Sequence, residues 1–337
     1  ILILKNDRAG DLFTSITLIS TLISKYKNIT IYLSEYNIGF SFLFNKSIIK
    51  KTNFNLKLKD KINIFVDIFK NRYDEIYILS PKSFYFLLPL IFRNIKFYAI
   101  VYNSNNNLRP SNFFRKFLYD FKIVYRNKIN YRSYRELQSD LIKDKSTLDI
   151  NHTSINIPDI DLKLKKIIPN KFILFQFRYL FFEQLGWDIK EFNFLISQIK
   201  SKYEYILFSS DIESNYSSKR FNDYFKNNYS IIDTTNFIKK INNKNENIFY
   251  LENINSKNLF HLLNLSSINL GKHGVFSHIS FFHKKKCHNL FNFILKNKDD
   301  FLHEKISYSE WYKGMDLKFS FLNKDIKKAS KKILKNI

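Results

Sequence analysis

Cysteine and long apolar runs are scarce in this sequence of 337 residues. The single cysteine, Cys287, excludes a disulfide framework and a cysteine-based zinc site, and it favours a reducing compartment. The most apolar stretch, residues 83–92, is followed by Arg93, Asn94 and Lys96 and is shorter than the roughly 20 apolar residues that span a bilayer. The sequence shows no signal-peptide pattern, so we expect a cytoplasmic protein.

Glycine is also scarce, with six residues in the whole chain. The common nucleotide motifs can therefore be tested directly. Neither the phosphate loop GxxxxGK[ST] nor the dinucleotide-binding turn GxGxxG occurs. Any nucleotide must be held in another way, and this scarcity makes Gly10, Gly271 and Gly274 more informative.

Acidic residues are few relative to basic ones, 30 against 55, and the formal net charge is +25. Taken alone, this excess suggests nucleic acid or an anionic membrane as partner. However, lysine outnumbers arginine 45 to 10, and isoleucine, asparagine and phenylalanine are abundant, as expected of an A/T-rich genome. Residues 1–150 carry +13 and residues 151–337 carry +12, so no separate basic domain exists.

Apolar runs of strand length alternate with segments of helix length, which is typical of β-α-β units and a parallel sheet. The predicted strands are residues 1–4, 29–33, 75–79, 96–101, 172–175, 205–209, 231–233 and 268–270. The predicted helices are residues 11–25, 62–69, 84–92, 134–144, 191–202, 217–226, 257–264 and 277–282, with residues 103–107 as a loop.

The periodicity fades over residues 151–169 and then restarts, which predicts a linker between two α/β domains. We predict an N-terminal domain over residues 1–150, a C-terminal domain over residues 170–320 and a basic C-terminal helix over residues 321–337. Ligands of open parallel sheets bind at the carboxyl ends of the strands, so we expect the site in the cleft between the domains.

The turn between the first strand and the first helix is polar. Gly10 permits a tight turn, and Asp11 lies in the first helical turn, where the helix dipole favours the ionised carboxylate. Such a carboxylate can accept a proton from a substrate hydroxyl. The alternative is that Asp11 only caps the helix.

Four segments resemble, in order and spacing, the heptosyltransferase-like family of glycosyltransferases (family 9). The opening strand, turn and apolar helix of that family resemble ILILKNDRAGDLFTSITLISTLISKY followed by NITIYL. Residues 134–144, YRELQSDLIKD, resemble the helix that closes the first domain. Residues 172–199 and 253–280 resemble the opening of the second domain and its G-x-D-[ST]-G-x-x-H motif. The similarity covers most of the chain.

This resemblance implies the GT-B architecture, in which two Rossmann-like parallel-sheet domains face an interdomain cleft. Members transfer a sugar, typically heptose from an ADP-activated donor, to a lipopolysaccharide core acceptor, with inversion and without an essential metal. Asp11 falls on the catalytic base of the family, and Arg8 and Gly10 belong to the same turn. The implied partners are a nucleotide sugar, which is a substrate and not a cofactor, and a lipid-linked or polysaccharide acceptor.

Such an enzyme must stabilise the negative charge of a departing diphosphate. The segment that follows the predicted strand 268–270 provides two glycines, a lysine and two histidines, namely Gly271, Lys272, His273, Gly274 and His278. The alternative is a basic loop without a ligand. His273 stands where the family has Asp, and Val275 where it has Gly, so the donor need not be ADP-heptose. A further alternative is a relative that keeps the fold without catalysis.

Other candidates follow predicted strands. Gln176 and Arg178 come after the strand 172–175, at the place of a phosphate-contacting loop in the family. Ser209 ends the next strand and Glu252 precedes the helix 257–264, where each could contact the nucleoside. The alternatives are that Arg178 is only a surface residue and that Glu252 is only a solvated carboxylate in a turn. We expect no metal, because a lysine triplet separates His283 from His288 and repels cations.

Two further hypotheses concern the basic surface. The predicted C-terminal helix places lysines on one face, which could contact an anionic membrane at the inner face of the cytoplasmic membrane. The alternative is a helix docked by its apolar stripe with its lysines in water. A nucleic-acid-binding protein would need aromatic residues exposed beside basic ones, whereas most aromatic residues here lie inside apolar runs. We therefore do not expect nucleic acid as partner.

Overall fold

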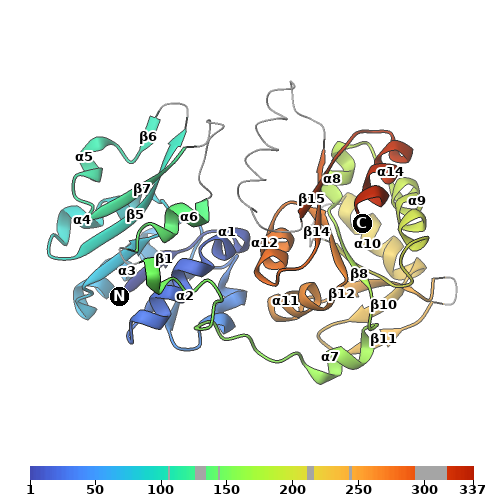
Figure 1. Cartoon of the computed structure of the whole chain (residues 1–337), viewed down its shortest axis with the longest axis horizontal. Helices are drawn as coiled ribbons and strands as arrows, with labels where there is room; N and C mark the ends of the chain where they lie inside the picture. Colours follow the sequence, from blue (N-terminus) through green and yellow to red (C-terminus); the bar gives the residue numbers. More distant parts are fainter. Residues whose placement is uncertain (105–106, 126–133, 143–144, 211–215, 243–244, 293–316) are drawn as a thin grey trace. The chain divides into compact units, whose positions relative to one another are not determined.

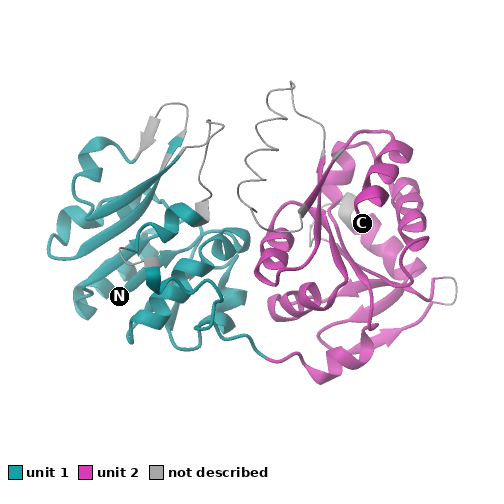
Figure 2. Cartoon of the chain, in the orientation of Figure 1, with its two compact units in different colours: residues 1–158, 299–313 teal, residues 159–298, 314–337 magenta. Residues whose placement is uncertain are grey.

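The computed structural model describes residues 1–104, 107–125, 134–142, 145–210, 216–242, 245–292 and 317–337. They form two compact units, with unit 1 containing Ile1–Pro158 and unit 2 beginning at Asp159 (Figure 2). The division lies inside the segment predicted as a linker, part of which forms helix α7 (Leu162–Ile167). Within the described residues, no helix combines the length and the apolar character that crossing a membrane requires.

Unit 1 is built on one sheet, in which β3, β2, β1, β4, β5 and β7 are parallel and β6 is antiparallel to β5 (Figure 1). Its strands are β1 (Leu2–Lys5), β2 (Thr30–Ser34), β3 (Ile48–Thr52), β4 (Glu75–Ile78), β5 (Lys96–Ser104), β6 (Asn107–Arg109) and β7 (Asp120–Tyr125). The central strand β1 is buried along its whole length, as its apolar residues Leu2, Ile3 and Leu4 favour, and Lys5 at its end is buried with them.

Helices cover both faces of this sheet. One face carries α1 (Ala9–Thr14), α2 (Ile16–Lys25) and α6 (Tyr134–Ser139) (Figure 1). The opposite face carries α3 (Leu58–Asn71), the 3-10 turn η2 (Ser83–Phe86), α4 (Leu88–Ile91) and α5 (Asn112–Arg115). The 3-10 turns η1 (Ile38–Phe44) and η3 (Lys145–Thr147) complete the unit.

Two predicted helices of unit 1 are each interrupted. The predicted helix 11–25 is broken at Ser15, because the hydroxyls of Thr14 and Ser15 donate hydrogen bonds to the Asp11 carbonyl and compete with the backbone pattern. The predicted helix 84–92 is a 3-10 turn followed by α4. Pro89 lies in the first turn of α4, where its missing N–H costs nothing.

Unit 2 contains an eight-stranded sheet in the order β11-β10-β12-β9-β8-β13-β14-β15, parallel except for β11. Its strands are β8 (Ile173–Phe177), β9 (Ile206–Ser210), β10 (Ser230–Asp233), β11 (Ile238–Lys240), β12 (Ile248–Glu252), β13 (Ile268–Lys272), β14 (Cys287–Asn292) and β15 (Leu317–Leu322). Its helices besides α7 are α8 (Tyr179–Gln184), α9 (Ile189–Lys200), α10 (Tyr216–Asn228), α11 (Ser256–Leu265), α12 (Val275–Phe282) and α14 (Ile326–Asn336).

Phenylalanine packs the core of unit 2. The ring of Phe177 lies 4.6 Å from that of Phe182, 4.9 Å from that of Phe221 and 5.1 Å from that of Phe225, measured between centroids. Such edge-on and tilted contacts add to the gain from burying the rings. These residues therefore form core, and they do not supply the exposed aromatic face that the nucleic-acid alternative requires.

The C-terminal helix begins later than predicted. Residues 321–322 belong to β15, and α14 starts after Asp325, whose carboxylate accepts hydrogen bonds from the amides of Lys327 and Lys328. Ala329 and Ile333 enter the core of unit 2 while the lysines stay exposed. This is the docked arrangement that the sequence left as an alternative.

Several strands were not predicted, and the predicted loop 103–107 lies partly in β5 and β6, with residues 105–106 outside the described part. The edge strand β3 contains two lysines and exposes Ile48, so it lacks a buried apolar run. Strand β14 buries polar residues, among them His288 and Asn289. In both strands the pairing with a neighbour, and not the local pattern, decides the structure.

Asp149 joins the last segment of unit 1 to α2. Its carboxylate accepts hydrogen bonds from the Ser20 hydroxyl and from the amides of Thr153 and Ser154, both at 2.9 Å. Burial acts to raise the pKa of this carboxyl, but the hydrogen bonds outweigh that effect and lower the pKa to about 2. A depressed pKa contributes stability above the unfolded-state value, and this contribution is lost as the pH falls toward 2.

We therefore predict that Asp149→Asn lowers the free energy of unfolding by about 1 kcal/mol at neutral pH, a figure discounted for the partial exposure of the carboxylate. Urea denaturation at pH 7 and at pH 3 measures the effect, and the gap between wild type and variant should be smaller at pH 3. The exposed Asp159→Asn is the control and should leave stability unchanged. A gap that does not depend on pH would contradict the assignment.

Candidate functional site

Hydrogen bonds join the loops at the carboxyl edge of the unit 1 sheet. The Asn37 side-chain amide donates to the Lys5 carbonyl at 2.8 Å, and the Ser34 hydroxyl donates to the Asp7 carbonyl. The Asn6 side-chain amide donates to the Asn53 carbonyl at 3.0 Å. The turn after β1 is thus fixed by residues that follow β2 and β3, so its conformation depends on the whole sheet edge.

A buried ion pair lies under this turn. Lys5 is fully buried, and its Nζ lies 2.7 Å from Asp7 Oδ2 and 3.3 Å from the Leu79 carbonyl oxygen. Burial raises the pKa of Asp7, the cation of Lys5 opposes this rise, and the negative charge of Asp11 adds to it. The sequence reasoning did not select this pair. A lysine and an aspartate two residues apart at the end of a buried strand were the available signal.

Asp11 lies in the first turn of α1 and is half-buried. No described residue donates a hydrogen bond to its carboxylate, and the hydroxyls of Thr14 and Ser15 donate to its backbone carbonyl. The N-cap is the exposed Arg8, whose side chain makes no capping hydrogen bond, and Asp11 lies three residues further on, in the first helical turn. The carboxylate is therefore available to a ligand.

Gly10 does not form the predicted tight turn. It is the second residue of α1, and it is absent from the described glycines that have positive φ, which are Gly186 and Gly274. The chain instead changes direction at Arg8, whose extended backbone (φ −81°, ψ 161°) leads into the helix. The turn therefore ends two residues earlier than the sequence suggested.

Lys82 supplies a cation at the same edge and was not selected from the sequence. It follows β4, and its Nζ lies 3.8 Å from the centre of the Phe54 ring. Burial lowers the pKa of Lys82, while the nearby carboxylates of Asp7, Asp11 and Glu35 oppose this shift. Its position after a predicted strand was the available signal, but only the sheet order brings β4 beside β1.

In unit 2, four adjacent strands bring candidate residues to one sheet edge. Glu252 ends β12 and Ser209 lies near the end of β9, while Gln176 and Gly271 lie next to each other on β8 and β13, one residue beyond the pair Phe175–Leu270. Gln176 lies within β8, whereas the sequence predicted that it follows this strand. A Cβ atom at Gly271 would lie 2.8 Å from the Gln176 Cβ, so this glycine is required by strand packing.

The loop from β13 to α12 contains the second candidate glycine. Gly274 has a φ of 158°, a value that other residues rarely adopt, and it precedes the first residue of α12, Val275. Its carbonyl accepts a hydrogen bond from the His278 amide at 3.2 Å. Gly274 therefore provides, one residue earlier, the backbone freedom that the family motif assigns to the position of Val275.

The two histidines of this loop lie close together. The rings of His273 and His278 are 5.4 Å apart, and the His273 ring is nearly parallel to that of Phe291 at 6.1 Å. Burial, with the charge of Lys272 as a second cause, lowers the pKa of His273 to about 4. His273 is therefore neutral at pH 7. Lys272 and the first backbone amides of α12 are positive groups of this loop.

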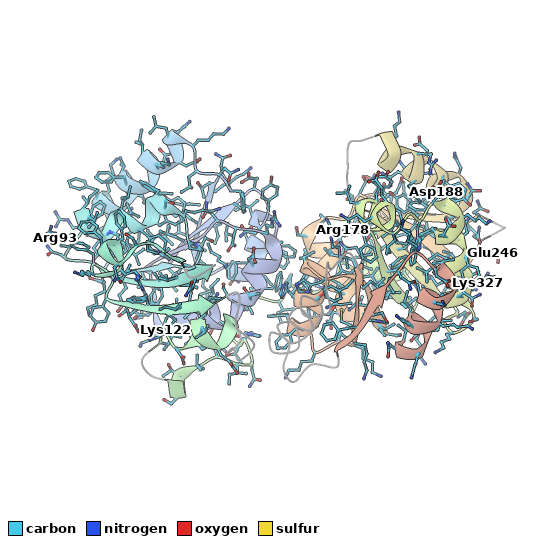
Figure 3. All side chains as sticks on the ribbon, turned by 90° about the horizontal axis from the view of Figure 1, so that it is seen from above. Arg93, Lys122, Arg178, Asp188, Glu246 and Lys327 are labelled. Carbon is cyan, nitrogen blue, oxygen red and sulfur yellow. The ribbon has the colours of Figure 1, made fainter. Side chains whose placement is uncertain are left out.

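The other candidates of unit 2 differ in burial and in their position on the elements. Arg178 precedes α8, is half-buried and makes no capping hydrogen bond with its side chain (Figure 3). Ser209 is buried. The Glu252 carboxylate lies 2.8 Å from Lys226 Nζ, so its charge is already compensated within the unit.

The histidines beside the lysine triplet have separate partners. His283 Nε2 lies 3.1 Å from the Phe260 carbonyl, and His288 Nε2 lies 2.8 Å from the Ser320 hydroxyl. Across the part of the chain that the structure describes, no group of three or more histidine, cysteine, aspartate or glutamate side chains is placed to hold a metal ion.

Neither a protein-family model nor a curated protein matches this sequence. Solved structures do resemble it. The ADP-heptose lipopolysaccharide heptosyltransferase II of E. coli aligns with a TM-score of 0.64 at 10% identity, over 99% of this chain and 96% of the other. A family 9 glycosyltransferase from Veillonella parvula aligns with a TM-score of 0.61 at 10% identity, over 100% and 89%.

A UDP-GlcNAc 2-epimerase from Methanocaldococcus jannaschii is also similar, with a TM-score of 0.57 at 14% identity over 99% of this chain and 91% of that one. Glycosyltransferases and an epimerase thus share one architecture with this chain. The likeness covers both units and agrees with their parallel sheets. The chain therefore has the GT-B fold that the resemblance to the heptosyltransferase-like family implied.

Proposed function

We propose that this chain is an inverting glycosyltransferase. It transfers heptose or a related sugar from a nucleotide-diphosphate donor to lipopolysaccharide or another cell-envelope glycan. The observation that carries the proposal is the Asp11 carboxylate, half-buried and without a hydrogen-bond donor among the described residues, at a strand end of a GT-B fold. The similar E. coli protein is an ADP-heptose lipopolysaccharide heptosyltransferase, which supports both the donor class and the acceptor class.

The chemistry assigns one role to each of the two neighbouring carboxylates. Asp11 accepts the proton of the acceptor hydroxyl while that oxygen attacks the anomeric carbon on the face opposite the leaving diphosphate. Asp7 is unsuited to this role, because its Oδ2 is held by the buried Lys5. Asp7 instead fixes the turn that leads to Asp11.

Unit 2 supplies the groups that suit a departing diphosphate. Lys272, Arg178 and the first amides of α12 can stabilise its negative charge, which is the role that the family resemblance assigns to this region without an essential metal. His273, being neutral, can contribute hydrogen bonds but no charge. Because a histidine stands in place of the family aspartate, the identity of the donor nucleotide is not fixed by the resemblance. The same replacement favours a second candidate function, an inactive relative that keeps the fold.

Asp11→Asn should retain the fold and lower kcat by at least about a hundredfold, because an amide cannot accept the proton in the transition state. Transfer assays with the donor identified below measure this loss, and thermal unfolding confirms the fold. Glu35→Gln is the matched control at the same sheet edge and should retain turnover within a few-fold. Full turnover by Asp11→Asn would remove Asp11 from the mechanism.

A thermal-shift screen with ADP-, GDP-, UDP- and CMP-sugars should identify one donor class. Lys272→Ala should weaken binding of that donor by about tenfold, the loss expected for a charge-assisted contact. His273→Ala should weaken it less. Lys327→Ala, on the exposed face of α14 (Figure 3), is the control and should bind normally.

Unchanged donor affinity in both loop variants would exclude the loop 271–278 as the diphosphate site. A screen in which no sugar nucleotide raises the melting temperature would favour the inactive relative. Salt-dependent retention on nucleic acid in the same preparation would revive the nucleic-acid alternative.

A further inference from the structure

Helix α3 exposes apolar side chains on the side opposite the core. Ile64 and Ile68 are buried in the core of unit 1. The exposed fractions on the opposite side are 73% for Leu58, 52% for Ile62, 39% for Val66 and 71% for Phe69. These four residues follow one another at intervals of four, four and three, which places them on one stripe. A surface helix normally presents polar residues there, so this stripe requires an explanation.

Neighbouring elements enlarge the apolar surface. Leu87 and Ile91, at 42% and 59% exposure, lie at the ends of η2 and α4, which cover the same face of the sheet as α3. The rings of Phe65 and Phe92, 5.1 Å apart, hold α3 against α4. Together, the outer apolar surface comprises Leu58, Ile62, Val66, Phe69, Leu87 and Ile91. Exposed apolar side chains gathered on one side of a domain mark interaction sites.

Cations border the stripe on α3. At 100° per residue, Lys59 and Lys70 lie along one side of the stripe and Lys61 lies along the other. Arg93, just beyond α4, lies at the periphery of unit 1 (Figure 3). The outer apolar surface is therefore flanked by positive charge.

The acidic residues of α3 do not offset this charge. Asp67 is buried and bound by Lys50, with the Tyr32 and Tyr73 hydroxyls donating to it at 3.0 and 3.1 Å. Asp60 accepts hydrogen bonds at 2.8 Å from the Asn53 side chain and from the Lys57 amide. Both carboxylates are thus engaged within unit 1, and the solvent side of α3 combines apolar residues with cations.

This combination selects one kind of partner. A second copy of the chain, paired about a two-fold axis, would bring the lysines of α3 toward the same lysines of its partner. Anionic lipid headgroups would neutralise these charges, while the apolar side chains enter the boundary between headgroups and acyl chains. Helix α14 has the lysines but not the apolar side chains, since Ala329 and Ile333 are buried in its own unit.

We propose that the outer apolar surface of unit 1 docks onto an anionic membrane, with Leu58, Ile62 and Phe69 as the inserting residues and the flanking lysines on the lipid phosphates. Hydrogen bonds link the first turn of α3 to the turn after β1. Asp60 in the first turn of α3 binds the Asn53 side chain, and the Asn53 carbonyl accepts from Asn6, which precedes the Asp11 turn. A docked unit 1 would hold this edge near the headgroups, which suits a lipid-linked acceptor; that consequence rests on the proposed function, whereas docking itself does not.

Flotation of the full chain with vesicles tests the proposal. The vesicles contain phosphatidylcholine with about 30% phosphatidylglycerol, in buffer of about 0.15 M salt. Wild type should float with these vesicles and not with vesicles of phosphatidylcholine alone. The triple variant Leu58→Ser, Ile62→Ser and Phe69→Ser should lose at least about tenfold in vesicle affinity. These side chains are exposed, so thermal unfolding should be unchanged.

Two lysine variants separate specific docking from the general basic charge. Lys59→Gln with Lys70→Gln should weaken binding several-fold and reduce its salt dependence. Lys327→Gln with Lys331→Gln, on α14, removes the same net charge and should float as wild type does. Equal losses in the two lysine pairs would overturn the assignment of the contact to α3.

Three further outcomes would overturn the proposal: no flotation of wild type, equal flotation of wild type and the triple variant, or equal binding to neutral vesicles. A wild-type dimer that the triple variant dissociates, without vesicle binding, would assign the surface to a second copy. Transfer to a water-soluble acceptor should be unchanged in the triple variant. Absence of transfer by wild type with vesicle binding intact would count against the proposed function alone.

Discussion

The buried charge of Lys5 constrains the candidate site of unit 1. A lysine without access to water is tolerated only where an opposite charge and further acceptors surround it. Asp7 and the Leu79 carbonyl provide these partners, one from the turn after β1 and the other from the end of β4. This requirement fixes the path of the chain after β1, and that path delivers Asp11 to the sheet edge with its carboxylate unengaged. Removing either charge of the pair would leave the other uncompensated and would disturb the turn.

The two units present complementary chemistry at their strand ends. Unit 1 presents carboxylates, of which Asp11 is available and Asp7 is held. Unit 2 presents Arg178, Lys272 and the start of α12, which suit an anion. His273 adds no charge to this anion-suited group, because burial and the neighbouring charge of Lys272 both lower its pKa. Under the proposed function, these groups supply the base and the anion site that transfer from a nucleotide sugar requires.

The positive charge of the chain has more than one origin. Most of it follows from a lysine-rich composition, and the lysines of α14 illustrate this, since they surround a helix whose apolar side serves only its own unit. The lysines of α3 differ because they flank exposed apolar side chains. Positive charge alone does not identify an interaction surface. Positive charge beside exposed apolar side chains does indicate one.

The sequence by itself determined the elements whose signals are local. Continuous apolar runs predicted the central strands β1 and β8, and the polar turn before the first helix made Asp11 a candidate site residue. The tertiary structure alone decided the edge strand β3 and the polar strand β14, because pairing with a neighbour outweighs local preference there. It also decided which apolar side of α3 faces the core. Periodicity shows that both sides are apolar, and only the position of the helix on the sheet determines which one is buried.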